Sequence, residues 1–344
     1  MSIDKKNKKA NIKYLAKLAG VSISTVSRAL NRSPEASEKT IARINELAKR
    51  VGYYPDSIAK GLRINKTHTI GVIFNDIQDP FFSDILWTIN EELYQFGYST
   101  IICYSNWQVN RERANIINLL SKKVDGIIMT PIEEDSKNID LLINNNIETV
   151  FVDSFSKHTT ISYACSNHAK AAYLGTEYLL KCGHKDILLV CAIPASSFSK
   201  LFIKGYKKAL NNYKIKIRND LIFNLDSISH EYCYNIFKDI ISKNKNKFTG
   251  VMITSDFIAI CFYKATNDLG LKIPQNYSIV GYDDIIISSA LSPPLTTVSQ
   301  SRKEIGYNAV QILINNIENK KNKIFKKVII EPLLVERNSV KKIN

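Results

Sequence analysis

From Thr69 onward the sequence alternates short apolar runs with longer amphipathic stretches, and this alternation limits the possible folds more than any other feature. The apolar runs have the length of strands, and helical periodicity separates most of them. Strands and helices in alternation build parallel sheets covered by helices on both faces. The number of strands indicates two lobes with doubly wound parallel sheets. The expected strands are 69–75, 99–104, 125–130, 149–153, 186–192, 250–255, 277–283 and 295–300.

The first 54 residues follow a different pattern, that of three short helices. Apolar residues recur at helical spacing in each of the three segments. Asn11, Ser22 and Ser37 stand where N-caps belong, because their side-chain oxygens accept from the free N–H groups of a first turn. Gly20 and Gly52 end the first and third segments, as residues that tolerate a positive φ. The pattern therefore predicts an all-α unit.

The positive charge is concentrated in the same part of the chain. Residues 1–66 hold 15 Lys and Arg against 5 Asp and Glu, whereas the remaining 278 residues hold 32 against 27. A small basic module ahead of a nearly balanced body indicates a polyanion partner for the module. We expect a helical headpiece over 10–54, a linker with a conditional hinge helix over 55–66, and a two-lobed body over 67–344.

The second helix of the headpiece is rich in hydroxyl side chains, and its apolar residues are small. If the apolar residues face inward, the opposite face presents serines together with Arg28. A short turn through Gly20 and Val21 would give a helix-turn-helix, whose second helix enters the major groove of DNA. Small hydroxyls reach phosphates and bases, and the arginine fork fits guanine O6 and N7. The alternative is an ordinary Ser-rich surface helix.

The segment IKYLAKLAGVSISTVSRALN resembles the headpiece of the LacI/GalR family of bacterial transcription regulators, and the likeness continues through ASEKTIARINELAKRVGYYP and SIAKGLR. Further along stand HTIGVIFNDIQDPFFSDI, KKVDGIIMTP, TVFVDS, CGHKDILLV, VGYDD and LTTVSQ, each at the place expected for the family. The resemblance implies a body of the periplasmic-binding-protein type. It also implies a repressor that binds a palindromic double-stranded DNA operator as a homodimer and responds to a small effector, commonly a sugar or nucleoside.

Carried over to this chain, the base-reading positions of the family fall on Ile23, Ser24 and Arg28. Leu62 matches the hinge-helix leucine that wedges into the central minor-groove step of the operator, with Arg63 beside it. Such an apolar wedge opens a base step and bends the duplex. The alternative for Leu62 is a buried leucine of the linker. The expected DNA-contacting residues are Ser22, Ile23, Ser24, Thr25, Ser27, Arg28, Asn31, Leu62 and Arg63.

Several predicted strands end in a polar or acidic residue. Ligands bind beyond the carboxyl ends of strands in open α/β sheets, so these groups are expected to meet in a cleft between the lobes. Carboxylates bind sugar hydroxyls, and aromatic side chains such as Trp107 stack on a ring. Each acid could instead be a helix N-cap. The chain departs from the family at Phe202, where arginine is usual. The expected effector-binding residues are Phe81, Phe82, Asp153, Asp256 and Asp283.

The sequence offers little for catalysis. G-x-S-x-G, P-loop and G-x-G-x-x-G motifs do not occur, and HEYCY at 230–234 lacks the second histidine of a zinc-protease helix. Asp283 and Asp284 are paired carboxylates, yet they stand without a nucleophile, cofactor signature or metal set. We therefore expect no enzyme, no cofactor and no metal. A sugar-binding transport protein is a further alternative, against which the basic headpiece and the missing signal peptide both count.

The cysteines and the hydropathy bear on the compartment. The six cysteines are scattered without a C-x-x-C pair, as in the reduced core thiols of a cytoplasmic protein. No apolar run approaches the roughly 18 residues that a membrane helix needs. We expect a cytoplasmic protein without a membrane partner.

Overall fold

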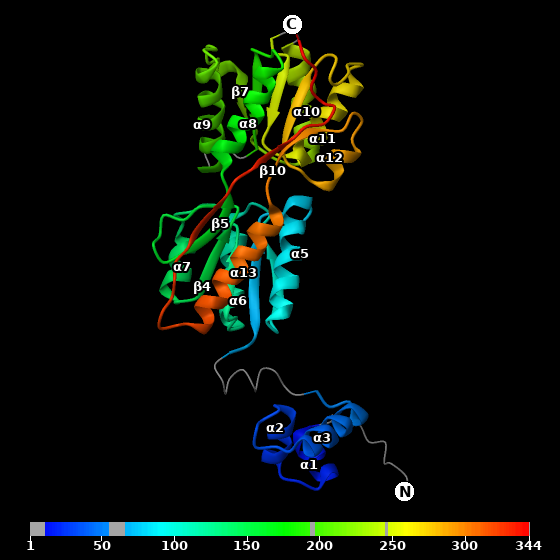
Figure 1. Cartoon of the computed structure of the whole chain (residues 1–344), viewed down its shortest axis with the longest axis vertical. Coiled ribbons are helices and arrows are strands. Elements are labelled where there is room, and N and C mark those ends of the chain that lie inside the picture. The colour runs from blue at the N-terminus through cyan, green and yellow to red at the C-terminus, as the bar shows by residue number, and fades with distance from the viewer. Residues whose placement is uncertain (1–10, 55–65, 193–196, 245–246, 344) are drawn as a thin grey trace. The chain divides into compact units, whose positions relative to one another are not determined.

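The computed structural model describes residues 11–54, 66–192, 197–244 and 247–343 (Figure 1). The chain divides into two compact units, Met1–Thr67 and His68–Asn344. Leu62 and Arg63 lie outside the described residues, so their expected contacts with DNA stay predictions. Within the described residues, no helix has the length and apolar character needed to cross a membrane.

The headpiece contains the three predicted helices. Each begins at its predicted cap, because the side chains of Asn11, Ser22 and Ser37 accept from the backbone N–H three residues on. Gly20 and Gly52 end their helices in the left-handed conformation, with φ of 63° and 66°. The inward residues of all three helices form one small core. The helices are α1 (Ile12–Ala19), α2 (Ile23–Leu30) and α3 (Glu38–Val51).

The first lobe of the body has a six-stranded parallel sheet in the order β11-β5-β4-β3-β1-β2. Helices α5 (Pro80–Gln95) and α13 (Arg302–Glu318) cover one face, and α6 (Val109–Ser121) and α7 (Lys137–Asn144) cover the other (Figure 1). The strands are β1 (Thr69–Phe74), β2 (Ser99–Tyr104), β3 (Gly126–Met129), β4 (Glu148–Val152), β5 (Ser162–Ser166) and β11 (Lys327–Ile330).

The second lobe has a six-stranded sheet in the order β12-β10-β9-β8-β6-β7, in which only β12 runs antiparallel to its neighbour. Helices α8 (His168–Lys181) and α9 (Ser197–Asn212) cover one face, and α10 (His230–Lys243) and α11 (Asp256–Asp268) cover the other. The strands are β6 (Ile187–Cys191), β7 (Ile222–Asn224), β8 (Gly250–Ile253), β9 (Ser278–Asp283), β10 (Thr296–Ser299) and β12 (Leu333–Val335). Shorter elements are α12 (Ile286–Ala290) and the 3-10 turn Asn219–Leu221.

Burial on both faces explains why the strands are apolar along their length. In β1, Ile70, Val72 and Phe74 pack under α5 and α13, while Ile73 packs under α6 and α7. Successive side chains of a strand point to opposite faces, so a sheet covered twice needs apolar residues at every position. The helices also approach closely: a Cβ on Gly205 of α9 would lie 2.0 Å from the carbonyl oxygen of Ala169 in α8.

The chain passes between the lobes three times. It leaves the first lobe from β5 to α8, returns from β10 to α13, and leaves again from β11 to β12. Neither lobe is therefore one continuous segment. The Nδ2 group of Asn167, at the first passage, donates to Oε1 of Glu331, at the third, over 3.0 Å.

The predicted fold class is confirmed, and all eight predicted strands occur with ends within two residues of their predicted positions. Four strands were not predicted: β5, β7, β11 and β12. Two of them have only three residues, and β5, with the sequence SYACS, lacks a strong apolar signal. All six cysteines are free thiols, five of them buried, as predicted.

Candidate nucleic-acid interface and ligand pocket

Helix α2 separates an inward from an outward face. Val26 and Ala29 are buried, whereas Ile23 is 45% exposed. Ser24 and Arg28 are also exposed, so the three expected base-reading side chains lie on the solvent side of one short helix. The Arg28 guanidinium meets the Glu35 carboxylate of the following loop, with an Nε–Oε2 distance of 3.0 Å.

The other expected DNA-contacting residues shape the two ends of α2. Ser22 Oγ accepts from the Thr25 N–H over 3.1 Å and shares hydrogen bonds with the hydroxyls of Ser24 and Thr25 at 2.7 and 2.9 Å. At the other end, the Asn31 amide donates to the carbonyl oxygen of Ser27 over 2.8 Å. The hydroxyls therefore surround the amino end of α2, which favours anions such as phosphate.

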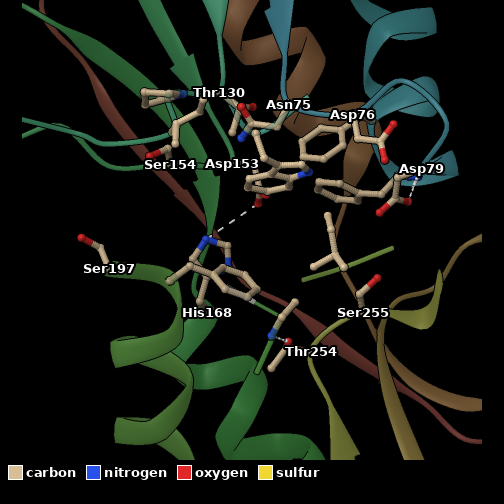
Figure 2. Close-up of a pocket in the computed structure, with 18 of the residues that line it drawn as sticks. Asn75, Asp76, Asp79, Thr130, Asp153, Ser154, His168, Ser197, Thr254 and Ser255 are labelled. Carbon is tan, nitrogen blue, oxygen red and sulfur yellow. Dashed lines mark hydrogen bonds and ion pairs between the residues drawn. The ribbon is translucent and has the colours of Figure 1, made fainter. Parts of the chain in front are cut away.

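The body contains a cavity of about 340 Å³ lined by residues of both lobes (Figure 2). This volume lies in the range of small-molecule sites. The cavity lies at the carboxyl ends of the strands, where open α/β sheets bind ligands. Residues that directly follow a strand and line the cavity are Asn75 after β1, Thr130 after β3, Asp153 after β4, Ala192 after β6, Thr254 after β8 and Gln300 after β10.

Four of the five expected effector-binding residues line this pocket: Phe81, Phe82, Asp153 and Asp283. The indole of Trp107 joins them. Asp153 and Asp283 have φ of 53° and 119°, so the backbone leaves the extended conformation at both carboxylates. Non-glycine residues with positive φ are uncommon and gather at functional sites.

Asp256 does not line the pocket and is a correction to the expected set. It is fully buried, and its carboxylate accepts from the hydroxyls of Ser288 and Thr297 over 2.6 and 2.7 Å. The N–H of Ile285 donates to it over 3.3 Å. A Cβ on Gly281 would lie 2.0 Å from its Oδ1. Asp256 therefore ties the start of α11 to the loop after β9 and to β10.

The carboxylates of the pocket are poorly solvated. Burial, followed by the charge of Asp76, raises the pKa of Asp79 to about 6. Burial and the charge of Asp79 raise the pKa of Asp153 well above its ordinary value. Burial, with Asp79 next in effect, raises the pKa of Asp283 well above its ordinary value. The three carboxyl groups therefore disfavour each other's ionised forms.

His168 lies beside Asp153 without neutralising it (Figure 2). Its Nε2 is 3.7 Å from Asp153 Oδ1, beyond hydrogen-bond distance. Burial lowers the pKa of His168 to about 3, so the imidazole is neutral. Its Nδ1 hydrogen-bonds with the Tyr282 hydroxyl at 2.8 Å, which fixes the ring.

The family's usual arginine position holds Phe202, which is fully buried. Its ring packs against Phe198 and Tyr282, with centroid distances of 4.8 and 4.9 Å. Phe198 in turn packs against His168 at 4.9 Å and lines the pocket. An aromatic cluster therefore occupies the place of a cation, and no arginine occurs among the lining residues that the structure describes.

Several lining residues were not predicted from the sequence, including Thr130, His168, Phe198 and Phe257. Position gives the missing signal for Thr130, which directly follows β3. His168, Phe198 and Phe257 stand in the first turns of α8, α9 and α11. Helix starts face the carboxyl edge of a parallel sheet, so the position of these three residues is the signal that could have indicated them.

The arrangement suits binding rather than catalysis. Aromatic rings and carboxylates line one cavity, which fits a hydroxyl-bearing ring. No three of the described His, Cys, Asp and Glu side chains are placed to hold a metal ion. The headpiece separately presents a basic, hydroxyl-rich helix, which fits DNA.

Known proteins share both the headpiece and the two-lobed body of this chain. A family model described as "Bacterial regulatory proteins, lacI family" matches residues 11–56, and one described as "Periplasmic binding proteins and sugar binding domain of LacI family" matches residues 67–338. The HTH-type transcriptional repressor PurR of Actinobacillus pleuropneumoniae serotype 3 (strain JL03) is 31% identical over 336 residues, which cover 97% of this chain and 99% of that protein.

Two solved structures illustrate the shared fold. The Lac repressor dimer bound to operator and the anti-inducer ONPF has a TM-score of 0.83 at 24% identity, covering 97% of this chain and all of that one. A LacI family transcriptional regulator from Enterococcus faecium with bound ribose has a TM-score of 0.71 at 26% identity, covering 80% of this chain and all of that one.

A helix-turn-helix headpiece followed by a two-lobed body with a ligand pocket defines a DNA-binding transcription regulator. This chain belongs to the LacI family of bacterial transcription regulators. The relatives are transcriptional repressors, which confirms the expectation that the chain is not an enzyme.

Proposed function

We propose that the chain is a cytoplasmic repressor that binds a palindromic operator as a homodimer and is controlled by a small carbohydrate-like effector in the pocket. The observation that supports this most directly is the pocket itself, because residues of both lobes line it in a chain that also carries a DNA-binding headpiece. The ribose bound to the Enterococcus faecium regulator supports a carbohydrate class of effector.

The pocket provides a way for an effector to move the lobes. Glu134, after β3 of the first lobe, accepts from Ser197 Oγ of α9 in the second lobe over 2.6 Å. It also accepts from Ser154 Oγ of the first lobe over 3.1 Å. An effector that contacts both lobes stabilises the arrangement of the lobes in which its own contacts with them are best. Its binding therefore shifts the population of body conformations.

The first lobe also offers a surface for a second copy of the chain. β2 is the edge strand of its sheet, and Ile102 and Tyr104 on it are 50% and 40% exposed. Tyr94 of α5 and Ile117 of α6, the helices that pack on β2, are 73% and 49% exposed. Exposed apolar edges invite pairing, and a second copy would cover this one in the homodimer.

Selection from a random double-stranded DNA library tests the proposal. The full-length chain would be incubated with the library with and without a pool of sugars and sugar phosphates, and the retained duplexes would be sequenced. We expect an enriched inverted repeat, because two headpieces related by twofold symmetry read two half-sites. A change of enrichment with the pool would give the sign of the effector response. Absence of any enriched sequence in both conditions would contradict specific operator binding.

A further inference from the structure

The lining of the pocket holds a large excess of acidic side chains. It includes the carboxylates of Asp76, Asp79, Glu133, Glu134, Asp135, Asp153 and Asp283. The cationic side chain in the lining is Lys157, which is 76% exposed and pairs with Asp135 at the rim. Hydroxyl groups of a neutral sugar leave such an excess uncompensated, whereas a bound cation compensates it.

The three inner carboxylates of the pocket are those of Asp79, Asp153 and Asp283. Within the described residues, no Lys or Arg side chain forms an ion pair with any of them. The charge of Arg302 acts on Asp79, but it lowers the pKa of that carboxyl less than burial raises it. Its Nε pairs with Asp84 at 3.0 Å, and it donates to the backbone oxygen of Asp283 rather than to the carboxylate. Asp153 faces the neutral imidazole of His168.

Buried polar atoms without a partner also mark this space. His168 and Gln300 are 1% and 2% exposed, and His168 Nε2 and Gln300 Oε1 make no hydrogen bond. Gln300 uses its other end, because its Nε2 donates to Asp283 Oδ1 over 2.8 Å. Asp153 Oδ1 is a further unpartnered atom. Buried polar groups are rarely left unpaired, so these atoms indicate a ligand.

The chemistry of these atoms indicates the partner they need. Asp153 Oδ1 and Gln300 Oε1 are both acceptors, and an ammonium group supplies three donors together with a positive charge. The Trp107 indole N–H is a donor without a partner and would meet a hydroxyl oxygen of the ligand. The rings of Phe81, Phe82 and Trp107 provide apolar and cation-attracting faces.

We propose that the pocket takes a ring-bearing organic ammonium, of which an amino sugar with a free amine is the carbohydrate form. The ammonium would lie among Asp79, Asp153 and Asp283, with the ring against the aromatic wall. This inference rests on the proposed function, which makes the pocket the effector site, and narrows its effector from carbohydrates in general to aminated ones.

Matched compounds test the charge directly. Monoaminated hexoses and pentoses would be titrated into the full-length chain at pH 7.5, each beside the parent sugar and its N-acetylated form. We expect at least one amine to bind about tenfold to a hundredfold more tightly than both of its neutral partners, as charge-assisted hydrogen bonds do. The proposal is overturned if no amine in the panel stabilises or binds the chain better than its parent sugar.

A variant pair keeps the test independent of the ligand panel. Asp153→Asn keeps the shape and suits the left-handed backbone at that position, while it removes the ionisable carboxyl group. Without ligand, and at a pH that ionises the Asp153 carboxyl, we expect the thermal midpoint of the variant to lie about 2 to 4 °C above that of the unaltered chain, because burial and Asp79 raise the pKa of this carboxyl and its ionised form opposes folding. Asp140→Asn, the same change on the exposed face of α7, is the control and should leave the midpoint unchanged.

The same variant separates a charge role from a packing role. Asp153→Asn should bring the affinity of the amine down to that of its parent sugar while the affinity for the parent sugar changes little. A lower midpoint with equal losses for both compounds would show that Asp153 only supports the fold, and would overturn the proposal. If the ammonium proposal fails, the chain still selects an operator, but no amine is preferred over its parent sugar. If the proposed function fails, no ligand of any charge changes DNA binding.

Discussion

In the headpiece the candidate functional side chains lie on the outer face of one short helix, whereas in the body they come from both sheets and face inward. Ile23 and Arg28 are exposed and stand within one element of eight residues. Asp153 directly follows β4 of the first lobe, Asp283 ends β9 of the second, and both border the pocket. Recognition by the headpiece is therefore separable from stability, while recognition by the body is coupled to it. Substitutions in the two regions should differ accordingly.

The largest effect is expected for Phe202→Ala in the body. Removing a fully buried aromatic ring leaves a cavity in the cluster with Phe198 and Tyr282, and such changes lower the free energy of unfolding by about 3 to 5 kcal/mol. Urea denaturation followed by circular dichroism measures it. Phe325→Ala is the control, because Phe325 is 42% exposed. Equal losses for both variants would show that the cluster is not a packing centre.

A smaller effect is expected for Arg28→Ala in the headpiece, and it concerns DNA binding rather than stability. Binding to the selected operator should weaken by about 1 to 3 kcal/mol, with the loss concentrated at one base pair. Lys39→Ala, an exposed change on α3, should weaken binding only slightly and on all sequences alike. Titration of operator variants by fluorescence anisotropy distinguishes the two patterns. A uniform loss for Arg28→Ala would show that this arginine contacts phosphate alone.

The body should also respond to pH through Asp79. Its pKa is raised from 3.8 to about 6 in the folded chain, mainly by burial, so the folded state binds this proton more tightly than the unfolded state. Its contribution to stability is present below pH 3.8 and is lost as the pH rises through about 6. Asp79→Asn should flatten the fall of the unfolding free energy over this window, and Asp140→Asn should not. Identical pH profiles for the chain and Asp79→Asn would contradict this.

The smallest effect is expected for Glu35→Gln, which frees Arg28 from its ion pair. Both side chains are more than half exposed, at 54% and 67%, and exposed pairs contribute less than about 1 kcal/mol. Operator binding should tighten by less than about fivefold. Glu46→Gln removes the same charge from an exposed residue of α3, so it controls for the general repulsion of DNA. If both variants tighten binding equally, the pair with Arg28 has no part in the effect.

The two regions also differ in how far sequence alone could predict them. The starts of the three headpiece helices and the ends of α1 and α3 were predicted to the residue, because caps such as Ser22 and Gly52 act on neighbours three or four positions away. Most strands of the body were predicted for a similar reason, since helices on both faces require continuous apolar runs. β11 and β12 were missed because their partners, β5 and β10, are distant in sequence.

The pocket shows the same limit. Asp153 and Asp283 were found because both end apolar strands, and the position of a strand end is a local property. Asp256 also follows a strand, yet its carboxylate is held by Ser288 and Thr297, which lie 32 and 41 residues away. No local pattern distinguishes a carboxylate that turns into the fold from one that faces a ligand. The place of Phe198 and His168 in one aromatic cluster likewise depends on packing between elements.

The three passages of the chain between the lobes also set an order of events during synthesis. The first lobe needs α13 and β11, which are translated only after β10, the last of the parallel strands of the second lobe. The headpiece is complete once residue 54 has emerged, and the five parallel strands of the second lobe are all present by residue 299. The lobe that is started first is therefore closed only after the five parallel strands of the second lobe have been made, and β12 then completes the second lobe.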